Sequence, residues 1–213
     1  MDKVFSKMFL WMFLGLIVTF GVGYYLSMNE TMMYNLFSGY KYMIVWVVEL
    51  IVVIVLSARI NKLSVWTARI LFILYSILTG LTVSTIFIVY SFSSILYVFL
   101  ITAILFLLFG LIGYFTKIDL SKFGIILMMI LLGCLIGTII NIFVNSNTFD
   151  LVTTIILVIV FLGYIAYDIN VIKRRLYGIE DEDKLAIYGA LQLYLDFINL
   201  FLNLLRLFGK DND

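Results

Sequence analysis

Seven long, nearly uncharged apolar runs divide this chain of 213 residues, and they decide what it can fold into. A hydrocarbon core about 30 Å thick is crossed by roughly 20 residues of α-helix. Because the runs are continuous rather than alternating with polar residues, they favour helices over barrel strands. The sequence therefore predicts an all-α membrane protein with a single domain over residues 1–213. The predicted transmembrane helices cover residues 8–28, 40–58, 66–90, 95–115, 123–144, 149–172 and 185–208.

Composition excludes several classes of protein. Apolar residues make up 64% of the chain and charged residues 13%, whereas soluble domains are about half apolar. The net charge of +1 and the lack of a basic face give no sign of a nucleic-acid partner. Without histidine, no His-based zinc, haem or general-base chemistry is available, and no bound cofactor is expected. The single cysteine, Cys134, cannot form an internal disulfide and is interpreted as a packing residue.

The distribution of positive charge predicts the orientation. In a seven-span arrangement, one side of the membrane collects eleven of the 14 Lys and Arg residues. By the positive-inside rule this side, which includes the N-terminus, is cytoplasmic. The C-terminus is then outside, unless the polar last segment only dips into the membrane and returns. Short termini without a targeting signal indicate a bacterial plasma membrane.

Two aspartates, Asp168 and Asp196, each lie inside an apolar run. A charged side chain at the bilayer centre costs roughly 2.5–3.5 kcal/mol on insertion scales, so such residues are functional candidates. The midpoint between them is position 182, within the charged run 180–184. If that run is the turn of an antiparallel helical hairpin, both acids lie at about the same depth. They would then be close enough to share a proton or a cation.

The last predicted helix carries a polar stripe. Steps of three and four residues place its polar side chains on one helical face. That face must contact other helices or water, because lipid offers no hydrogen-bond partner. One interpretation is a hydrogen-bonded seam between helices; the other, favoured by the presence of an acid, is the wall of an ion path. The stripe consists of Tyr188, Gln192, Asp196, Asn199, Asn203 and Arg206.

The second predicted helix adds Glu49 near its middle and Arg59 at its cytoplasmic end. An arginine beside a carboxylate favours the charged acid and can hold it in a charge-assisted pair. Two interpretations of Arg59 stay open: a latch that engages Asp168 or Asp196 and closes the cytoplasmic mouth, or a simple anchor at the membrane surface.

The chemistry of the available ligands narrows the choice of bound ion. Carboxylate, amide and hydroxyl oxygens suit Ca²⁺ or Mg²⁺ rather than zinc or copper. Two acids a few ångströms apart cannot both ionise cheaply, so their titration is coupled. A cation bound between Asp168 and Asp196 would compete with their shared proton. The pair is therefore predicted to sense protons and to bind Ca²⁺.

The C-terminal segment resembles the signature of the Bax inhibitor family, also called the transmembrane Bax-inhibitor-motif family. The resemblance rests on an acidic turn at 180–183, Gly-Ala-Leu at 189–191, and Leu-Tyr-Leu-Asp-Phe-Ile-Asn at 193–199. Tyr-Asp at 167–168 and the acid Glu49 also fit. The seven-run layout extends the likeness over essentially the whole chain, although the first five helices match mainly in hydropathy. The absence of proline departs from many members.

The resemblance implies a last helix that is central and wrapped by the other six. Bacterial relatives act as pH-sensitive calcium leak channels, with two aspartates as the pH sensor and an arginine latch. These roles correspond by position to Asp168, Asp196 and Arg59. The predicted function is a passive calcium pathway through the lipid bilayer, gated by protons. Glu49, Gln192, Asn199 and Asn203 are the candidate pore-lining residues.

Three alternatives belong to other classes. An intramembrane aspartyl protease also places Tyr-Asp on one span and Asp on the next. However, it uses a Gly-x-Gly-Asp motif where this chain has Leu-Tyr-Leu-Asp at 193–196, and a Pro-Ala-Leu segment that a chain without proline cannot supply. The protein is therefore predicted not to be an enzyme. A proton-coupled transporter could use the same carboxylates, and a regulatory membrane scaffold would use the polar stripe only for packing.

Overall fold

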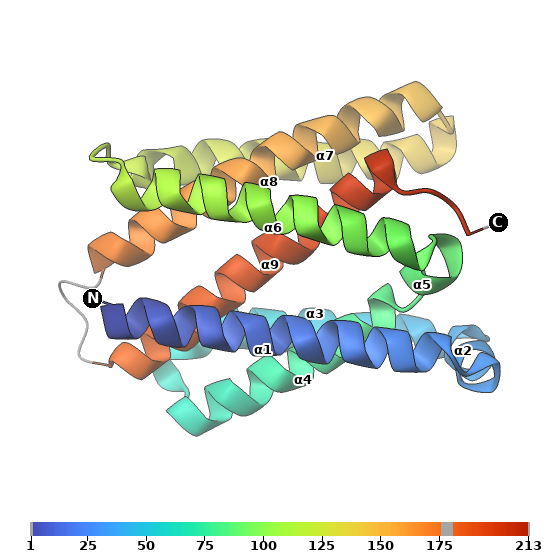
Figure 1. Ribbon diagram of the computed structural model, residues 1–213, viewed down its shortest axis with the longest axis horizontal. Helices are drawn as coiled ribbons and strands as arrows, with labels where there is room; N and C mark the ends of the chain where they lie inside the picture. The colour runs from blue at the N-terminus through green and yellow to red at the C-terminus, as the bar shows by residue number, and fades with distance from the viewer. Residues whose placement is uncertain (1, 176–180, 213) are drawn as a thin grey trace. The chain divides into compact units, whose positions relative to one another are not determined.

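The computed structural model describes residues 2–175 and 181–212, and these fold into helices that confirm the seven predicted spans (Figure 1). Each span is long and apolar enough to cross a membrane. The helices are α1 (Asp2–Ser27), α2 (Glu30–Phe37), α3 (Lys41–Arg59), α4 (Val65–Val83), α5 (Ile86–Val89), α6 (Phe92–Phe115), α7 (Gly124–Val144), α8 (Asn147–Arg175) and α9 (Glu182–Phe208), with 3-10 turns η1 (Ile60–Lys62) and η2 (Leu120–Phe123).

Two local features differ from the sequence prediction. The predicted helix 66–90 is interrupted after Val83, where the Ser84 hydroxyl donates a hydrogen bond to the Leu81 carbonyl. Such side-chain bonds compete with the helical backbone pattern. The short helix α2 was not predicted, because eight residues are too few for a span. It begins at an N-cap, Asn29, whose side-chain oxygen accepts from the Met32 amide at 3.0 Å.

The predicted turn before the last helix is also shorter than expected. Residues 176–180 lie outside the described part of the chain, but α9 already begins at Glu182. The Asp181 carboxylate accepts a hydrogen bond from the Lys184 amide and caps the helix. Glu182 and Asp183 therefore belong to the first turn of α9 rather than to a loop. Acids are favourable there because the helix N-terminus carries partial positive charge.

The chain divides into two units. Unit 1 contains residues 1–92, 179–194 and 211–213; unit 2 contains residues 93–178 and 195–210. Helix α9 runs through both, with its first half in unit 1 and its second half in unit 2. A single domain over residues 1–213 stays a prediction.

In unit 1, helix α4 packs against both α1 and α3. Gly80 permits the close approach of α1, because a Cβ atom at this position would lie 2.7 Å from the Thr19 carbonyl oxygen. The first half of α9 packs here through Tyr194, which is completely buried. Its ring makes edge contacts with the rings of Phe72 and Tyr75 at centroid distances of 5.7 and 5.9 Å.

In unit 2, helix α8 packs against α7 and α6. The contact with α6 is close, because a Cβ atom on Gly113 would lie 2.2 Å from the carbonyl oxygen of Ala166. Helix α6 also contacts the second half of α9, where Phe197 packs against Phe99 and Phe106 at centroid distances of 5.2 and 5.7 Å. Helix α6 thus touches both helices that carry the predicted acid pair.

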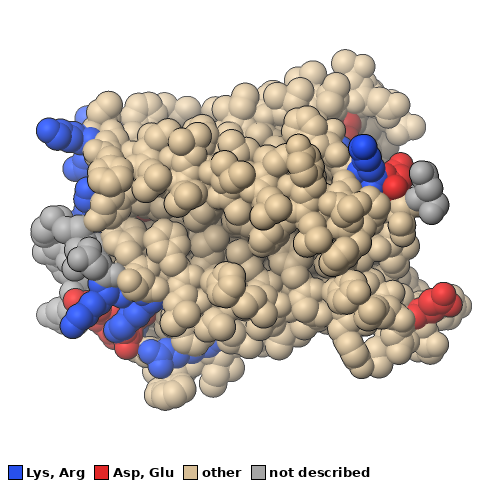
Figure 2. Space-filling model, viewed as in Figure 1, with Lys and Arg blue, Asp and Glu red and all other residues tan. Residues whose placement is uncertain are grey.

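The burial pattern fits a membrane protein. The most apolar stretch of α9 is 72% buried, compared with 44% or less in the six other spans. Large apolar side chains on α3 and α7 are exposed, as lipid-facing residues are. On the face drawn in Figure 2, charged side chains lie near helix ends and the helix sides between them are uncharged.

Candidate proton and cation site

Asp168 on α8 and Asp196 on the second half of α9 lie together in unit 2. They are only 7% and 5% exposed, and their carboxyl groups lie within side-chain hydrogen-bonding reach of each other. An ionised carboxylate has no proton to donate. A hydrogen bond between the two side chains therefore requires a proton on one of them.

One oxygen atom of the pair lacks a hydrogen-bond donor among the described residues. Atom Oδ2 of Asp196 is buried and accepts no hydrogen bond from the described residues. The hydroxyl of Tyr164, one turn before Asp168, is close enough to both carboxyl groups to interact with them electrostatically. A fully charged carboxylate has about four acceptor positions to satisfy. The site therefore retains capacity for a proton or a cation.

Close helix contacts hold the part of α8 that carries Asp168. On one side of the acid, Ala166 lies against Gly113 of α6. On the other, Ile169 lies against Gly110, where a Cβ atom would be 2.9 Å from its Cδ1. The two glycines are three residues apart and so share a face of α6. Asp168 is thus presented by a helix whose register against α6 is fixed on both sides.

The amides of the polar stripe bond within their own helix. The Asn199 side chain donates to the Leu195 carbonyl, and the Asn203 side chain donates to the Asn199 carbonyl, both at 2.8 Å. These bonds are consistent with a structural role for the polar stripe. Gln192 is half-buried and lies in unit 1. Pore-lining roles for all three residues stay predictions.

The C-terminal end of the stripe forms an ion pair. Arg206 lies 3.5 Å from Asp150 of α8, and both side chains are about half exposed. Exposed pairs of this kind contribute little stability. Arg206 is thus occupied at the helix end, within the same unit as the acid pair.

Glu49 lies in a different environment, in unit 1. Its Oε1 atom accepts a hydrogen bond of 2.8 Å from the Thr79 hydroxyl, and the Thr82 hydroxyl is a further neighbour. Thr79 also lies within hydrogen-bonding reach of the Tyr75 and Tyr194 hydroxyls. This hydroxyl cluster was not predicted from the sequence. The signal was present, since residues 79 and 82 are three positions apart on one helical face.

Arg59 ends α3 in unit 1 and its side chain is exposed. Asp183, by contrast, forms ion pairs in this unit, with Lys7 of α1 and, at 3.3 Å, with Arg69 of α4. These contacts attach the first turn of α9 to its neighbours and were not predicted. The latch role of Arg59 stays a prediction.

Acidic side chains of the described residues do not form a tight metal centre. Across residues 2–175 and 181–212, no group of three or more His, Cys, Asp or Glu side chains is placed to hold a metal ion. Calcium usually takes six to eight oxygen ligands. The pair Asp168 and Asp196 could supply only part of such a shell, which suits brief contact with a passing cation.

Comparison with known proteins settles the family. A family model described as "Inhibitor of apoptosis-promoting Bax1" matches residues 1–213. This chain belongs to the Bax inhibitor-1 family. The resemblance inferred from residues 178–201 is thereby confirmed at the level of the family, and the protein is an integral membrane protein of that family.

Bacterial members of the Bax inhibitor-1 family align over nearly the whole chain. Inner membrane protein YbhL of Escherichia coli is 44% identical over 211 residues, which cover 96% of this chain and 90% of YbhL. An uncharacterized protein of Borreliella burgdorferi is 38% identical, with coverages of 98% and 92%. Another from Deinococcus radiodurans is 36% identical, with coverages of 98% and 90%.

Proposed function

We propose that this Bax inhibitor family member is a passive cation pathway of the bacterial inner membrane, that Ca²⁺ is its main ion, and that protons regulate it. The observation that carries the proposal is the buried pair Asp168 and Asp196, with one carboxylate oxygen lacking a partner among the described residues. The E. coli relative is named an inner membrane protein, which supports the location.

The chemistry of the pair supplies the regulation. With one proton, the carboxyl groups of Asp168 and Asp196 can hydrogen-bond and hold α8 and α9 together. Without it, two like charges in a low-dielectric interior repel each other or recruit a cation. A divalent ion and the proton thus compete for the same oxygens. Weak, incomplete coordination favours conduction, because an ion must be able to leave the site that it enters.

The proposal is tested by calcium entry into proteoliposomes between about pH 6 and about pH 8, where a buried acid pair can titrate. The variants are Asp168→Asn and Asp196→Asn, which keep shape and remove the titrating group. We expect each to remove most of the pH dependence of the wild-type flux. Asp150→Asn is the matched control, since it makes the same chemical change on an exposed acid of α8. Unchanged pH dependence in both sensor variants would refute the proposal.

One structural observation also agrees with the protease alternative. Two aspartates that share a proton are the catalytic arrangement of aspartic proteases. The missing Gly-x-Gly-Asp and Pro-Ala-Leu motifs argue against it. Incubation of the same vesicles with a transmembrane substrate separates the two, and we expect no cleavage that depends on Asp168 or Asp196.

The other two alternatives are separated by the direction of transport. A proton-coupled transporter would accumulate calcium against its gradient when a pH difference is imposed, whereas a passive pathway only equilibrates it. A regulatory scaffold would show the same physiology in the Asp168/Asp196 double variant as in wild type. We expect equilibration without accumulation, and loss of activity in the double variant.

A further inference from the structure

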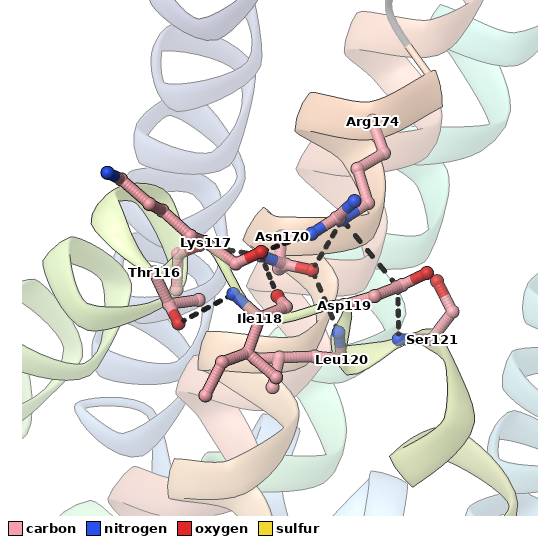
Figure 3. Close-up of polar contacts among 9 residues, drawn as sticks. Thr116, Lys117, Ile118, Asp119, Leu120, Ser121, Asn170 and Arg174 are labelled. Carbon is pink, nitrogen blue, oxygen red and sulfur yellow. Dashed lines mark hydrogen bonds and ion pairs between the residues drawn. The ribbon is translucent and has the colours of Figure 1, made fainter.

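Asn170, two residues after Asp168, joins α8 to the loop between α6 and α7, which we call the α6–α7 loop (residues 116–123). It is 1% exposed. Its amide nitrogen donates to the carbonyl oxygens of Gly113 at 3.2 Å and Ile118 at 3.3 Å. Its oxygen accepts from the Leu120 amide at 3.1 Å and from Arg174 Nε at 3.1 Å. A single buried side chain thus satisfies backbone groups before, within and after the turn of this loop (Figure 3).

Basic residues of the next turn of α8 extend the connection. Arg174 donates to the Lys117 carbonyl at 3.2 Å and lies 3.6 Å from the Asp119 carboxylate. Lys173 donates to the Tyr114 carbonyl at 2.6 Å. Figure 3 shows the Arg174 side chain reaching from α8 to the same loop that Asn170 holds. The contacts cover the α6–α7 loop and the last turn of α6.

The connection acts on Asp168 through the helix backbone. Residues two apart on a helix point about 200° apart, so Asn170 and Asp168 do not share a face. The helix between them is stiff, and Ala166 and Ile169 are wedged against Gly113 and Gly110. A shift or rotation of this end of α8 would therefore move the Asp168 carboxyl group relative to Asp196.

We infer that Asn170 is a positioning residue for the proton sensor: by clamping α8 to the α6–α7 loop, it fixes the depth and rotation of Asp168. This inference rests on the proposed function, because it concerns the same acid pair. Removing the clamp lets α8 adjust its register. Asp168 and Asp196 then interact less strongly, and the response of the flux to pH becomes shallower.

Other ionisable groups face this region and must be held constant in a test. They are Tyr114 of α6, Lys117, Asp119 and Lys122 of the α6–α7 loop, Tyr164, Tyr167, Lys173 and Arg174 of α8, and Asp196 of α9; α7 contributes Gly124, which lies against Tyr167. A change at Asn170 that introduces no charge leaves all of them in place. For this reason the test avoids Asn170→Asp.

The test compares Asn170→Leu and Asn170→Ser with wild type. Leucine is similar in volume and removes all four hydrogen bonds, whereas serine keeps one donor and one acceptor on a shorter side chain. The readout is the ratio of calcium flux at about pH 6 to that at about pH 8. We expect the ratio to move toward one by roughly three- to tenfold with leucine, a shift that corresponds to the net contribution of about one of the four hydrogen bonds, and by less with serine.

Asn141 provides a matched control in the same unit. Its side chain also joins a helix to a loop, accepting from the Ser146 amide at 3.0 Å and donating to the Ser146 carbonyl at 3.2 Å. Asn141→Ser tests whether any loss of a loop contact in unit 2 alters the response. We expect Asn141→Ser and Asn170→Ser to lower thermal stability to a similar degree, and only Asn170→Ser to change the flux ratio.

The outcomes separate this inference from the proposed function. If Asp168→Asn loses its pH dependence while Asn170→Ser keeps the wild-type ratio, the positioning role is wrong and the sensor stands. If Asp168→Asn keeps the wild-type response, both fail together. If Asn170→Leu does not fold, the flux ratio of Asn170→Ser tests the inference. An equal change of ratio in Asn141→Ser would also overturn the inference, because the effect would then be one of general stability.

Discussion

The two units each place an acid inside a membrane span, and the two acids have different neighbours. In unit 1, Glu49 is half-buried and accepts a hydrogen bond from Thr79 within a cluster of hydroxyl groups. In unit 2, Asp196 is buried beside a second acid, Asp168, and one of its oxygens has no partner among the described residues. Glu49 therefore has hydrogen-bond donors beside it, whereas Asp196 has another carboxyl group beside it.

The hydrogen-bond donors beside each acid determine how the site responds when it gains or loses a proton. A carboxylate that receives hydroxyl hydrogen bonds can gain or lose a proton while its neighbours reorient in place. In a pair of carboxyl groups, a proton also changes the force between the two helices that carry them. The comparison predicts that regulation belongs to Asp168 and Asp196, and that Glu49 serves hydrogen bonding and ion contact.

The largest expected effect contrasts Glu49→Gln with Asp196→Asn. We expect Glu49→Gln to lower the size of the calcium flux and to keep its pH dependence. Asp196→Asn should abolish a response that reaches up to about tenfold per pH unit for one titrating proton. Flux measured across the same pH series checks both. If both variants reduce the pH dependence equally, the predicted difference between Glu49 and Asp196 is wrong.

The hydroxyl cluster is tested by Thr79→Val, which keeps the shape of the side chain and removes the donor to Glu49. Because Glu49 is half-buried and keeps Thr82 as a neighbour, only one hydrogen bond is lost, and we expect the free energy of unfolding in detergent to fall by about 0.5–1.5 kcal/mol. Thr79→Ser keeps the hydroxyl and is the control. A free energy of unfolding equal to wild type in Thr79→Val would mean that the cluster does not stabilise unit 1.

Arg59 comes next in expected size. If it acts as the latch that the sequence predicts, Arg59→Ala should raise calcium leak at neutral pH by roughly twofold to fivefold, the range for an exposed ion pair of up to about 1 kcal/mol. The latch needs a charged acid, so the difference from wild type should disappear as the pH falls. Arg59→Lys is the control for charge. A leak equal to wild type at neutral pH would reduce Arg59 to an anchor.

The smallest effect concerns Asp119 in the α6–α7 loop. The Ser121 amide donates to its carboxylate at 3.0 Å and, with the Ser121 hydroxyl, Arg174 and Lys122, lowers the pKa of Asp119. A lowered pKa gives stability that is present above the unfolded-state pKa of about 4 and is lost as the pH falls through the folded-state pKa. Asp119→Asn should therefore show slightly less acid destabilisation, measured by thermal unfolding. A steeper loss in acid would contradict the sign.

The sequence alone was enough to predict the transmembrane spans and the proximity of Asp168 and Asp196. Continuous apolar runs fix helix length in a bilayer, and Asp168 and Asp196 lie at equal distances from position 182. Only the turn between them was too long in the prediction, because Glu182 and Asp183 lie in the first turn of α9. Hydropathy does not distinguish a loop acid from one in the first turn of a helix.

Tertiary contacts were harder to predict from the sequence. The donors to Glu49 come from α4, about 30 residues later in the chain, and the partners of Asn170 come from a loop about 50 residues earlier. A single sequence contains no record of which helices pack together. Asn170 could be suspected only because a polar residue at the end of an apolar span needs partners.

The central claim is that Asp168 and Asp196 share one proton. Infrared difference spectroscopy between about pH 8 and about pH 6 measures it directly, because protonated carboxyl groups absorb apart from carboxylates and buried pairs titrate as one unit. We predict a protonated carboxyl band that is lost in Asp168→Asn and equally in Asp196→Asn, and that persists in Glu49→Gln. A band that survives unchanged in either aspartate variant would contradict the shared proton.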